Sequence, residues 1–524
     1  MIFKVNLTKK DWLGTKKNSS LEKSILGFIH QEEIVESYTV DNLDKETFEN
    51  DLKESLTGFF SLIIEGENKI YAAVDHIRSH PLFYLERNGY FYLSDNVEWL
   101  CQQVNNLKFD NLAKDEFQIT GYVTGNSTLY KDVKQLQAGE LLIFENGKLL
   151  IKSYYEFNHT EPEDYNEEKL KSELHIVASA AIARLVEYAN GRQIVIPLSG
   201  GYDSRLIATL LKESNYPNIF TFTYGAKGNK EAVYSKVVAD HLGLKWHFIE
   251  YTEELWSQAW NANERKEYQQ YSSNYVSLPH IQDWLAVKIL KEKNLIDENA
   301  VFVPGHTGDM VSGGHIPNFI HQDLNKIFTN KELVESLISK HYSLKDFNKL
   351  NISKNIYEKI VRENIVFKEF YSASEFANEC EKWNWRNRQA KFICNSVRVY
   401  EFYGYDWWLP LWDKDFIHFF ENLPLKLRNH TWYKNYVSDI FASKTNIINL
   451  THSLERKWAV RKILDFVKRN DRVKGVVIKF YRLFFGKINN LSLKINNKDE
   501  MRLIKKGYSF NGILALYYIK DLEK

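Results

Sequence analysis

The middle of the chain alternates between short apolar runs and helical patterns, and this alternation limits the folds open to it. The runs RQIVIPL, NIFTFTYG and LKWHFIEY (192–251) are separated by the helical patterns SRLIATLLKES and NKEAVYSKVVADHLG. A later helical pattern, IQDWLAVKILKEKN, leads into the apolar run AVFVPG. Alternation at this spacing is typical of parallel strands whose sheet is covered by helices on both faces. The sequence therefore predicts an α/β unit with a doubly wound parallel sheet.

The first 160 residues show a different pattern, of short apolar or alternating runs separated by turn residues. These runs include GFFSLIIEG, KIYAAVDH and GELLIFENGKLLIKSYYEF, and Asn88-Gly89 lies where a hairpin turn is expected. The polar stretch HTEPEDYNEEK follows as a linker, and from about residue 320 the chain has a mainly helical pattern. We predict an N-terminal domain over 1–160, an α/β domain over 166–445 and a helical extension over 446–524.

Composition excludes several classes of protein. The 69 basic and 68 acidic residues give a net charge of +1, without the basic excess typical of nucleic-acid-binding proteins. The three cysteines show no zinc-site spacing and suit a reducing compartment. The N-terminal stretch MIFKVNLTKKDW has no apolar core of signal-peptide length, and no apolar run in the chain reaches the length of a transmembrane helix. We therefore expect a cytoplasmic protein with no nucleic-acid partner and no transmembrane segment.

The loop SGGYDS (199–204) carries the residues best suited to binding phosphates. It follows the first strand of the α/β unit, and ligands of such sheets bind beyond the carboxyl ends of the strands. The glycines let the backbone approach an anion, and the following helix offers free N–H groups. Asp203 would repel a bare phosphate, so the combination suits a polyphosphate with Mg²⁺. The alternative is a glycine turn that caps a helix.

SGGYDS resembles the pyrophosphate loop of the asparagine synthetase family, within the wider group of N-type ATP pyrophosphatases. The segments VFVPGHTGDMVSGGH (301–315) and LPLWDKDFIHFFENLP (409–424) are similar to two further segments of that family, and the resemblance covers most of residues 170–440. It implies that ATP and Mg²⁺ are cofactors and that Asp203 and Asp309 are the Mg²⁺ ligands. The residues expected to contact ATP are Leu198, Ser199, Gly200, Gly201, Asp203, Ser204, Thr223, Gly225 and Gly305.

The resemblance also implies a reaction. In the family a carboxylate attacks the α-phosphorus of ATP to give an acyl-adenylate and pyrophosphate, and an amine then displaces AMP to leave an amide. Mg²⁺ would screen the repulsion between carboxylate and triphosphate, and Lys434 would stabilise charge that develops in the transition state. The alternative for Lys434 is an ordinary solvated lysine. The expected partners are a small-molecule or peptide carboxylate and an amine, and a partner enzyme or a homodimer is compatible with the sequence.

The N-terminal domain resembles the family's class II glutaminase domain, a β-sandwich of the Ntn-hydrolase type. The similarity lies in LTGFFSLIIEG and VDHIRSHPLFYLERNGYFYLSDN, within 56–96. The family's nucleophile is a cysteine directly after the initiator methionine, whereas residue 2 here is Ile2 and the nearest cysteine is Cys101. Because glutamine hydrolysis needs a thiolate, we expect a degenerate, structural domain and a ligase that uses ammonia or a substrate amine. A glutamine-dependent asparagine synthase served by a separate glutaminase is the alternative.

His306 stands where asparagine synthetases have a glutamate and β-lactam synthetases a tyrosine. A histidine could act as a base toward the amine, with Glu401 as a candidate partner acid. The alternatives are a hydrogen-bonded loop histidine and an acid satisfied in the core. The stretch WNWRNRQAKFICNSVRVYEFYGYDWWLP (383–410) is expected to be mostly core, with Arg386, Arg388 and Arg398 holding anions or forming salt bridges.

Two other classes of function remain open on the sequence alone. An RNA-modifying ATP pyrophosphatase shares the SGG-x-DS loop, but the near-neutral charge counts against it. A non-catalytic relative would bind nucleotide or a partner, but the presence of Asp203, Asp309 and Lys434 counts against it. The basic, amphipathic stretch at 456–488 predicts a helix packed on the synthetase domain, with a membrane surface or partner enzyme as alternatives.

Overall fold

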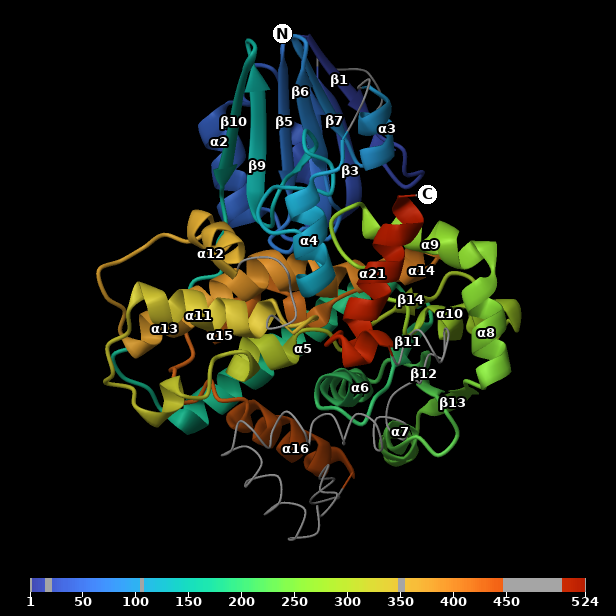
Figure 1. The fold of residues 1–524 in the computed structure, drawn as a ribbon. Helices are drawn as coiled ribbons and strands as arrows, with labels where there is room; N and C mark the ends of the chain where they lie inside the picture. The colour runs from blue at the N-terminus through green and yellow to red at the C-terminus, as the bar shows by residue number, and fades with distance from the viewer. Residues whose placement is uncertain (1, 15–20, 104–107, 347–353, 446–501, 524) are drawn as a thin grey trace.

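A five-stranded parallel sheet lies in the C-terminal part of the computed structural model, which describes residues 2–14, 21–103, 108–346, 354–445 and 502–523 (Figure 1). Every pair of neighbouring strands is parallel, which confirms the predicted α/β class with a parallel sheet. In spatial order the strands are β13 (Lys245–Glu250), β12 (Ile219–Gly225), β11 (Ile194–Pro197), β14 (Val301–Phe302) and β15 (Asp406–Trp407).

The strand order reverses at β11. From β11 the chain passes through α6 (Asp203–Glu213) to β12 and through α7 (Lys230–Leu242) to β13, and β14 then pairs with the opposite side of β11. The loops that follow β11 and β14 therefore leave the same edge of the sheet side by side. In open parallel sheets this reversal forms the crevice where ligands bind.

The N-terminal part contains two further sheets that share one apolar cluster, with members such as Ile63, Ala72, Phe91 and Leu93. Asn88 and Gly89 both have positive φ and join β6 to β7, as a two-residue hairpin turn requires. One sheet has the order β1 (Ile2–Asn6), β7 (Tyr90–Ser94), β6 (Phe83–Arg87), β8 (Lys134–Gln135); the other has β10 (Lys148–Ser153), β9 (Glu140–Glu145), β5 (Lys69–Val74), β4 (Gly58–Glu65), β3 (Glu22–Ile29), β2 (Leu13–Gly14).

Helices complete both parts. Asn166 caps the start of α5 (Glu167–Ala189), because its side chain accepts a hydrogen bond from Lys169 N. A separate helical lobe consists of α11 (Asn330–His341), α12 (Lys354–Glu363) and α13 (Ala373–Trp383), which pack around their own apolar cluster. Four short helices interrupt the N-terminal part, where the sequence predicted mostly strand: α1 (Glu32–Ser37), α2 (Lys45–Asn50), α3 (Val97–Gln102) and α4 (Asn111–Thr120). Further helices are α8 (Glu253–Asn261), α9 (Asn263–Ser273), α10 (Trp284–Glu292), α14 (Arg398–Phe402), α15 (Lys414–Glu421), α16 (Thr431–Thr445) and α21 (Phe510–Leu522).

The N-terminal part and the parallel-sheet part share a buried boundary. Trp385 Nε1 donates to the carbonyl of His76 at 2.7 Å, and His76 Nε2 lies 2.6 Å from the carbonyl of Trp412. The predicted linker is bound to this boundary, since Thr160 N donates to the carbonyl of Glu421 at 2.7 Å. The basic stretch 456–488 lies outside the described residues. None of the helices in the described ranges has the length and apolarity that a membrane span needs.

His159, at the end of the N-terminal part, is expected to make stability depend on pH. Burial and the charge of Arg428 lower its pKa to about 3, while its Nε2 lies 2.9 Å from the carbonyl of Leu423. Below the unfolded-state value of about 6.5 the unfolded chain binds the proton and the folded chain does not, so acid lowers stability. His159→Gln should remove about 1 kcal/mol of the loss in unfolding free energy between about pH 7 and about pH 5.5.

Urea titrations of both proteins at the two pH values measure this difference. Equal losses in the wild-type and His159→Gln proteins would show that another group binds the proton.

Candidate nucleotide site at the strand reversal

The loop after β14 packs directly on the loop after β11. A Cβ atom added to Gly305 would lie 2.5 Å from the backbone nitrogen of Ser204, and one added to Gly308 would lie 2.3 Å from Asp203 Oδ1. The backbone N–H of Asp309 also bonds to the Asp203 carboxylate. The structure therefore brings Asp203 and Asp309 together from segments about a hundred residues apart in the chain.

The two carboxylates have opposite electrostatic environments. Burial, and after it the charge of Asp309, raises the pKa of Asp203 to about 7. The Tyr433 hydroxyl donates to Asp203 Oδ1 at 3.0 Å, and this hydrogen bond acts in the opposite direction by lowering the pKa. Partial burial would raise the pKa of Asp309, but His315 and Arg388 lower it to about 2; His315 Nε2 lies 3.3 Å from Asp309 Oδ2. Two acids held this close repel each other, and a shared cation would relieve that repulsion.

The donor set at this place suits Mg²⁺ in the presence of phosphates. No group of three or more metal-ligating side chains occurs in the described part of the chain, so the protein alone offers an incomplete coordination sphere. Mg²⁺ is commonly held by one or two carboxylates together with substrate phosphates and water. Asp203 and Asp309 match that arrangement.

The SGGYDS loop already holds an anionic group on its backbone. The N–H of Gly200 donates to the Glu231 carboxylate at 2.8 Å, and Glu231 comes from the start of α7. The N–H of Gly201 donates to Ser199 Oγ at 3.1 Å, and Ser199 N donates to Ser204 Oγ at 3.2 Å. A phosphate oxygen has the same hydrogen-bonding needs as the Glu231 carboxylate, so this loop can accept one.

A hydrogen bond joins the ends of β11 and β12 near three of the residues that were expected to contact ATP, Leu198, Thr223 and Gly225. Thr223 Oγ1 donates to the carbonyl of Leu198 at 2.5 Å and lies 2.6 Å from Ser235 Oγ. Gly225 has a φ of 139°, and a Cβ added there would lie 2.6 Å from Asn229 Nδ2. Leu198, Thr223 and Gly225 therefore form one continuous edge beside the SGGYDS loop.

Lys434 lies on the same side of the site, on α16. Its ammonium group is 5.5 Å from the centre of the Tyr202 ring, and its charge lowers the pKa of Asp203. The start of α16 is fixed to the loop after β14, because His430 N donates to the carbonyl of Ser312 at 3.0 Å. Gly313 is required at this contact, since it has a φ of 85° and an added Cβ would lie 1.9 Å from the carbonyl oxygen of Arg428.

His306 and Glu401 have different surroundings from each other. His306 is half-buried, with Nδ1 3.3 Å from Ser396 Oγ, and burial and the neighbouring His280 lower its pKa to about 3. Glu401 accepts from Lys9 Nζ and from the Tyr271 hydroxyl, each at 3.0 Å, and it also pairs with Arg398. Among the described residues, no hydrogen bond or ion pair links His306 to Glu401. The Glu401 carboxylate is instead occupied by Lys9, Tyr271 and Arg398.

Sequence reasoning missed three residues of this site. Tyr433 donates to Asp203, His315 lies against Asp309, and Glu231 accepts from the phosphate loop. His315 ends the motif VFVPGHTGDMVSGGH, and its position after Gly-Gly was the only signal available for it. Tyr433 and Glu231 lie on helices with ordinary polar patterns, so one sequence alone gives no signal for either.

Gly308→Ala is expected to lower the rate of any reaction that needs Asp203 in place. The added methyl would meet Asp203 Oδ1 at 2.3 Å and the Tyr433 hydroxyl at 2.6 Å, and the carboxylate would have to move. A displacement on the order of 1 Å at a reacting centre costs about 10²-fold in rate. The initial rate of pyrophosphate release measures the effect.

Gly14→Ala is the matched control for this substitution, because a Cβ there meets no atom of the described residues within 4 Å. An unchanged rate in Gly308→Ala would show that Asp203 has no positional role.

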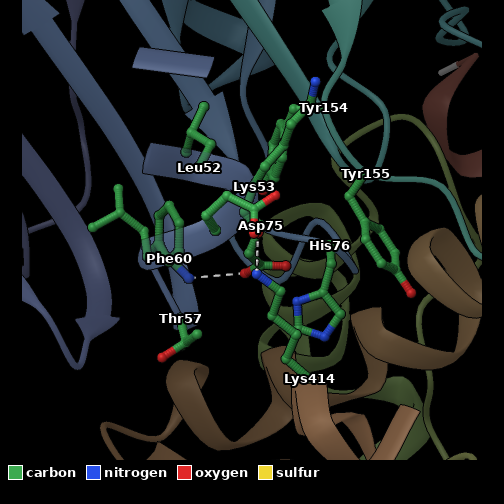
Figure 2. Close-up of a pocket in the computed structure, with 12 residues that line it drawn as sticks. Leu52, Lys53, Thr57, Phe60, Asp75, His76, Tyr154, Tyr155 and Lys414 are labelled. Atoms are coloured by element: carbon green, nitrogen blue, oxygen red, sulfur yellow. Dashed lines mark hydrogen bonds between the residues drawn. The ribbon is translucent and has the colours of Figure 1, made fainter. Parts of the chain in front are cut away.

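A cavity of about 290 Å³ lies away from this site, between the N-terminal sheets and α15, and Asp75, His76 and Lys414 are among its lining residues (Figure 2). Figure 2 shows the Asp75 carboxylate accepting from the N–H of Phe60, at 2.8 Å. Asp75 also accepts from Ile77 N at 2.8 Å and from Ser79 N at 3.2 Å. These bonds occupy the carboxylate, and we assign Asp75 a structural role.

Comparison with known families identifies the chain. The asparagine synthase family model matches residues 189–464, more than half of the chain, and a glutamine amidotransferase domain model matches residues 45–155. The chain belongs to the asparagine synthase family. It is 27% identical over 203 residues to asparagine synthetase [glutamine-hydrolyzing] 1 of Bacillus subtilis, a match that covers 38% of this chain and 32% of the relative. The chain thus matches about a third of that relative's length.

Solved structures give only distant likenesses. The NH3-dependent NAD synthetase of Campylobacter jejuni has a TM-score of 0.20 and 17% identity over 29% of this chain and 62% of its own. The glutamine-dependent NAD+ synthetase of Acinetobacter baumannii, solved with adenosine diphosphate, has a TM-score of 0.19 and 11% identity over 70% of this chain and 85% of its own.

Proposed function

We propose that the chain is an ATP-dependent ligase that forms a carbon–nitrogen bond, with domains at 1–160 and 166–445. It activates a carboxylate as an acyl-adenylate, releases pyrophosphate and passes the acyl group to ammonia or to a substrate amine. The observation that carries this proposal is the convergence of Asp203, Asp309 and Lys434 beside a glycine loop, in a member of the asparagine synthase family.

The charged groups of the site would lower the barrier to attack of the carboxylate on the α-phosphorus of ATP. Mg²⁺ bound to Asp203 and Asp309 would screen the repulsion between carboxylate and triphosphate. The amides of the SGGYDS loop would hold the phosphates after exchanging the Glu231 carboxylate for phosphate oxygens. Lys434 would neutralise charge on the departing pyrophosphate, where an electrostatic contact lowers the barrier.

Glutamine hydrolysis is not expected from the three cysteines of the chain. Burial raises the thiol pKa of Cys101 and of Cys394 to about 12, and it raises that of buried Cys380 as well. A nucleophilic cysteine needs the opposite shift, toward the thiolate. We therefore propose that the amidotransferase-like domain, which we assign to the Ntn-hydrolase type, has a structural role here.

His306 would orient the incoming amine. Its low pKa keeps the imidazole neutral at physiological pH, so a ring nitrogen can accept a hydrogen bond from the amine. The same low pKa makes it a weak base, and the proton of the amine would pass on to solvent or to the departing adenylate.

Pyrophosphate release from Mg·ATP, followed across a panel of carboxylic acids, tests the proposal. We expect release that depends on one class of acid, and an amide product when ammonium is added. Glutamine in place of ammonium should give no amide. Release that requires RNA would indicate an RNA-modifying enzyme, and a failure to bind ATP in calorimetry would indicate a non-catalytic relative; either result would overturn the proposal.

A further inference from the structure

An apolar patch lies on the surface of the helical lobe, which is on the opposite side of the molecule from α8 (Figure 1). Two segments, 319–327 and 366–370, contribute six of the fifteen large apolar side chains that are exposed in the described part of the chain. Single exposed apolar side chains are normal, but a cluster of this size marks an interaction surface. The six side chains, here called the lobe patch, have exposed fractions from 39% to 81% and are Phe319, Leu324, Ile327, Val366, Phe367 and Phe370.

Backbone pairing brings the two segments side by side. Phe328 N donates to the carbonyl of Tyr371 at 2.8 Å, and Tyr371 N donates to the carbonyl of Phe328 at 3.0 Å. Both side chains are buried in the apolar cluster of the lobe. Because side chains alternate between the two faces of a strand, the preceding residues Ile327 and Phe370 point outward on the same face. The lobe patch is therefore one surface, formed by two separate segments of the chain.

The backbone beneath the lobe patch is held in place by further contacts. Lys368 N donates to the Tyr371 hydroxyl at 3.1 Å, and Asn330 Nδ2 donates to the carbonyl of Lys368 at 2.7 Å. The ring of Phe319 packs on that of Phe328, with 5.8 Å between the ring centres. A surface fixed in this way loses little conformational entropy when a partner binds to it.

The size of the lobe patch fits one half of a dimer interface. Its six side chains expose on the order of 500 Å² of apolar surface, which is near the upper limit for a monomer. In a dimer of standard size each partner buries about 800 Å², and about 65% of a homodimer interface is apolar. One copy of the lobe patch therefore supplies the apolar area that one subunit of a stable homodimer contributes.

The charges beside the lobe patch favour a second copy of this chain over an oppositely charged partner. The charged residues of the two segments are Lys326, Lys368, Asp323 and Glu369. Two cations and two acids give a net charge of zero, and two copies of a neutral surface do not repel each other. Lys326 pairs with Glu332 of α11 at 2.9 Å. Lys368 pairs with Glu375 of α13 at 2.9 Å, so an anionic lipid surface would have to compete with existing ion pairs for both lysines.

We propose that the lobe patch is the interface of a symmetric homodimer, in which two copies of the chain pack lobe against lobe. In a two-fold arrangement the same surface serves both subunits, and each copy can set its acids beside the lysines of the other. The apolar side chains would form the centre of the interface and the charged side chains its rim. A homodimer of this kind does not require the proposed ligase function.

Sedimentation velocity of the whole chain, from about 0.1 µM to about 50 µM, tests the proposal. We expect the wild-type protein to change from monomer to dimer within this range, because the interface has the size and the apolar centre of a stable one. Ile327→Glu and Phe370→Glu should each raise the dissociation constant of the dimer by about 100-fold or more, since a symmetric interface receives each new charge twice.

Ile176→Glu is the matched control, because Ile176 is an exposed apolar residue on α5, outside the lobe patch. It should leave the dissociation constant unchanged. Since Ile327, Phe370 and Ile176 are all exposed, none of the three substitutions should lower the melting temperature of the diluted, monomeric protein by more than about 2 °C.

Other occupants of the lobe patch would give different results. A wild-type protein that stays monomeric throughout this range, or a dimer that Ile327→Glu and Phe370→Glu leave intact, would overturn the proposal. Flotation of a monomeric wild-type protein, but not of Ile327→Glu, with phosphatidylcholine–phosphatidylglycerol vesicles would assign the surface to a membrane instead. If Ile327→Glu lowered the melting temperature of a monomeric protein by several degrees, another part of the same chain would cover the patch, and the homodimer would again be ruled out.

Discussion

Asp203→Asn and Asp309→Asn are each expected to reduce acid-dependent pyrophosphate release by about 10²–10³-fold. Each substitution removes one negative charge from the pair that would hold Mg²⁺ against the triphosphate, while the amide keeps the shape of the side chain. The Tyr433 hydroxyl can still donate to the amide oxygen at residue 203. Initial rates at saturating Mg·ATP measure the loss.

The two substitutions should differ in their effect on stability. Burial and the charge of Asp309 raise the pKa of Asp203 to about 7 from its ordinary value of 3.8, so the folded protein binds a proton that the unfolded chain releases. Stability therefore falls as the pH rises through this window. In EDTA at about pH 8, Asp203→Asn removes the penalty and should raise the melting temperature by about 2 °C or more.

Asp309→Asn removes a carboxylate whose pKa is lowered to about 2, so it should lower the melting temperature instead. Asp240→Asn is the control, because Asp240 is an exposed acid on α7 that pairs with Lys236. A wild-type rate in Asp203→Asn would end the assignment of this loop to nucleotide chemistry.

The convergence of Asp203 and Asp309 was expected from the resemblance to the asparagine synthetase family, and the strand order of the structure explains it. Strands β11 and β14 are apolar runs followed by glycine-containing loops, and adjacent parallel strands place such loops at one edge. The short helices α1 to α4 could not be anticipated in the same way. Three of them have only six residues, too few for helical periodicity to show against the surrounding strand pattern.

The surroundings of Glu401 and Arg388 could not be read from one sequence. Glu401 is satisfied by Lys9, which is 392 positions away, and by Tyr271, which is 130 positions away. Arg386, Arg388 and Arg398 look alike in sequence, and only the folded chain shows that two of them have carboxylate partners. Side-chain pairing across domains depends on tertiary packing, and local patterns carry no information about it.

A buried ion pair beneath the site should have the largest single effect on stability. Arg428 Nη2 lies 2.6 Å from Glu381 Oε1, and both side chains are 0% exposed. Arg428 also lies over the ring of Phe157. Its carbonyl oxygen would meet a Cβ atom added to Gly313, and it lies three residues before α16, the helix that carries Lys434. The pair therefore connects the helical lobe to the segment that positions the site.

Arg428→Met is expected to lower the unfolding free energy by about 3–5 kcal/mol, because it leaves Glu381 buried without its partner. Burial already raises the pKa of Glu381 to about 7 despite the charge of Arg428. The double substitution Arg428→Met with Glu381→Leu removes both charges and should recover most of the loss. Urea unfolding at about pH 7 measures the unfolding free energy of each protein. Lys236→Met is the control: it breaks the exposed Lys236–Asp240 pair and should lower the unfolding free energy by less than about 1 kcal/mol. If the double variant were as unstable as Arg428→Met alone, packing of the arginine, and not compensation of a buried charge, would be the reason that the pair is needed.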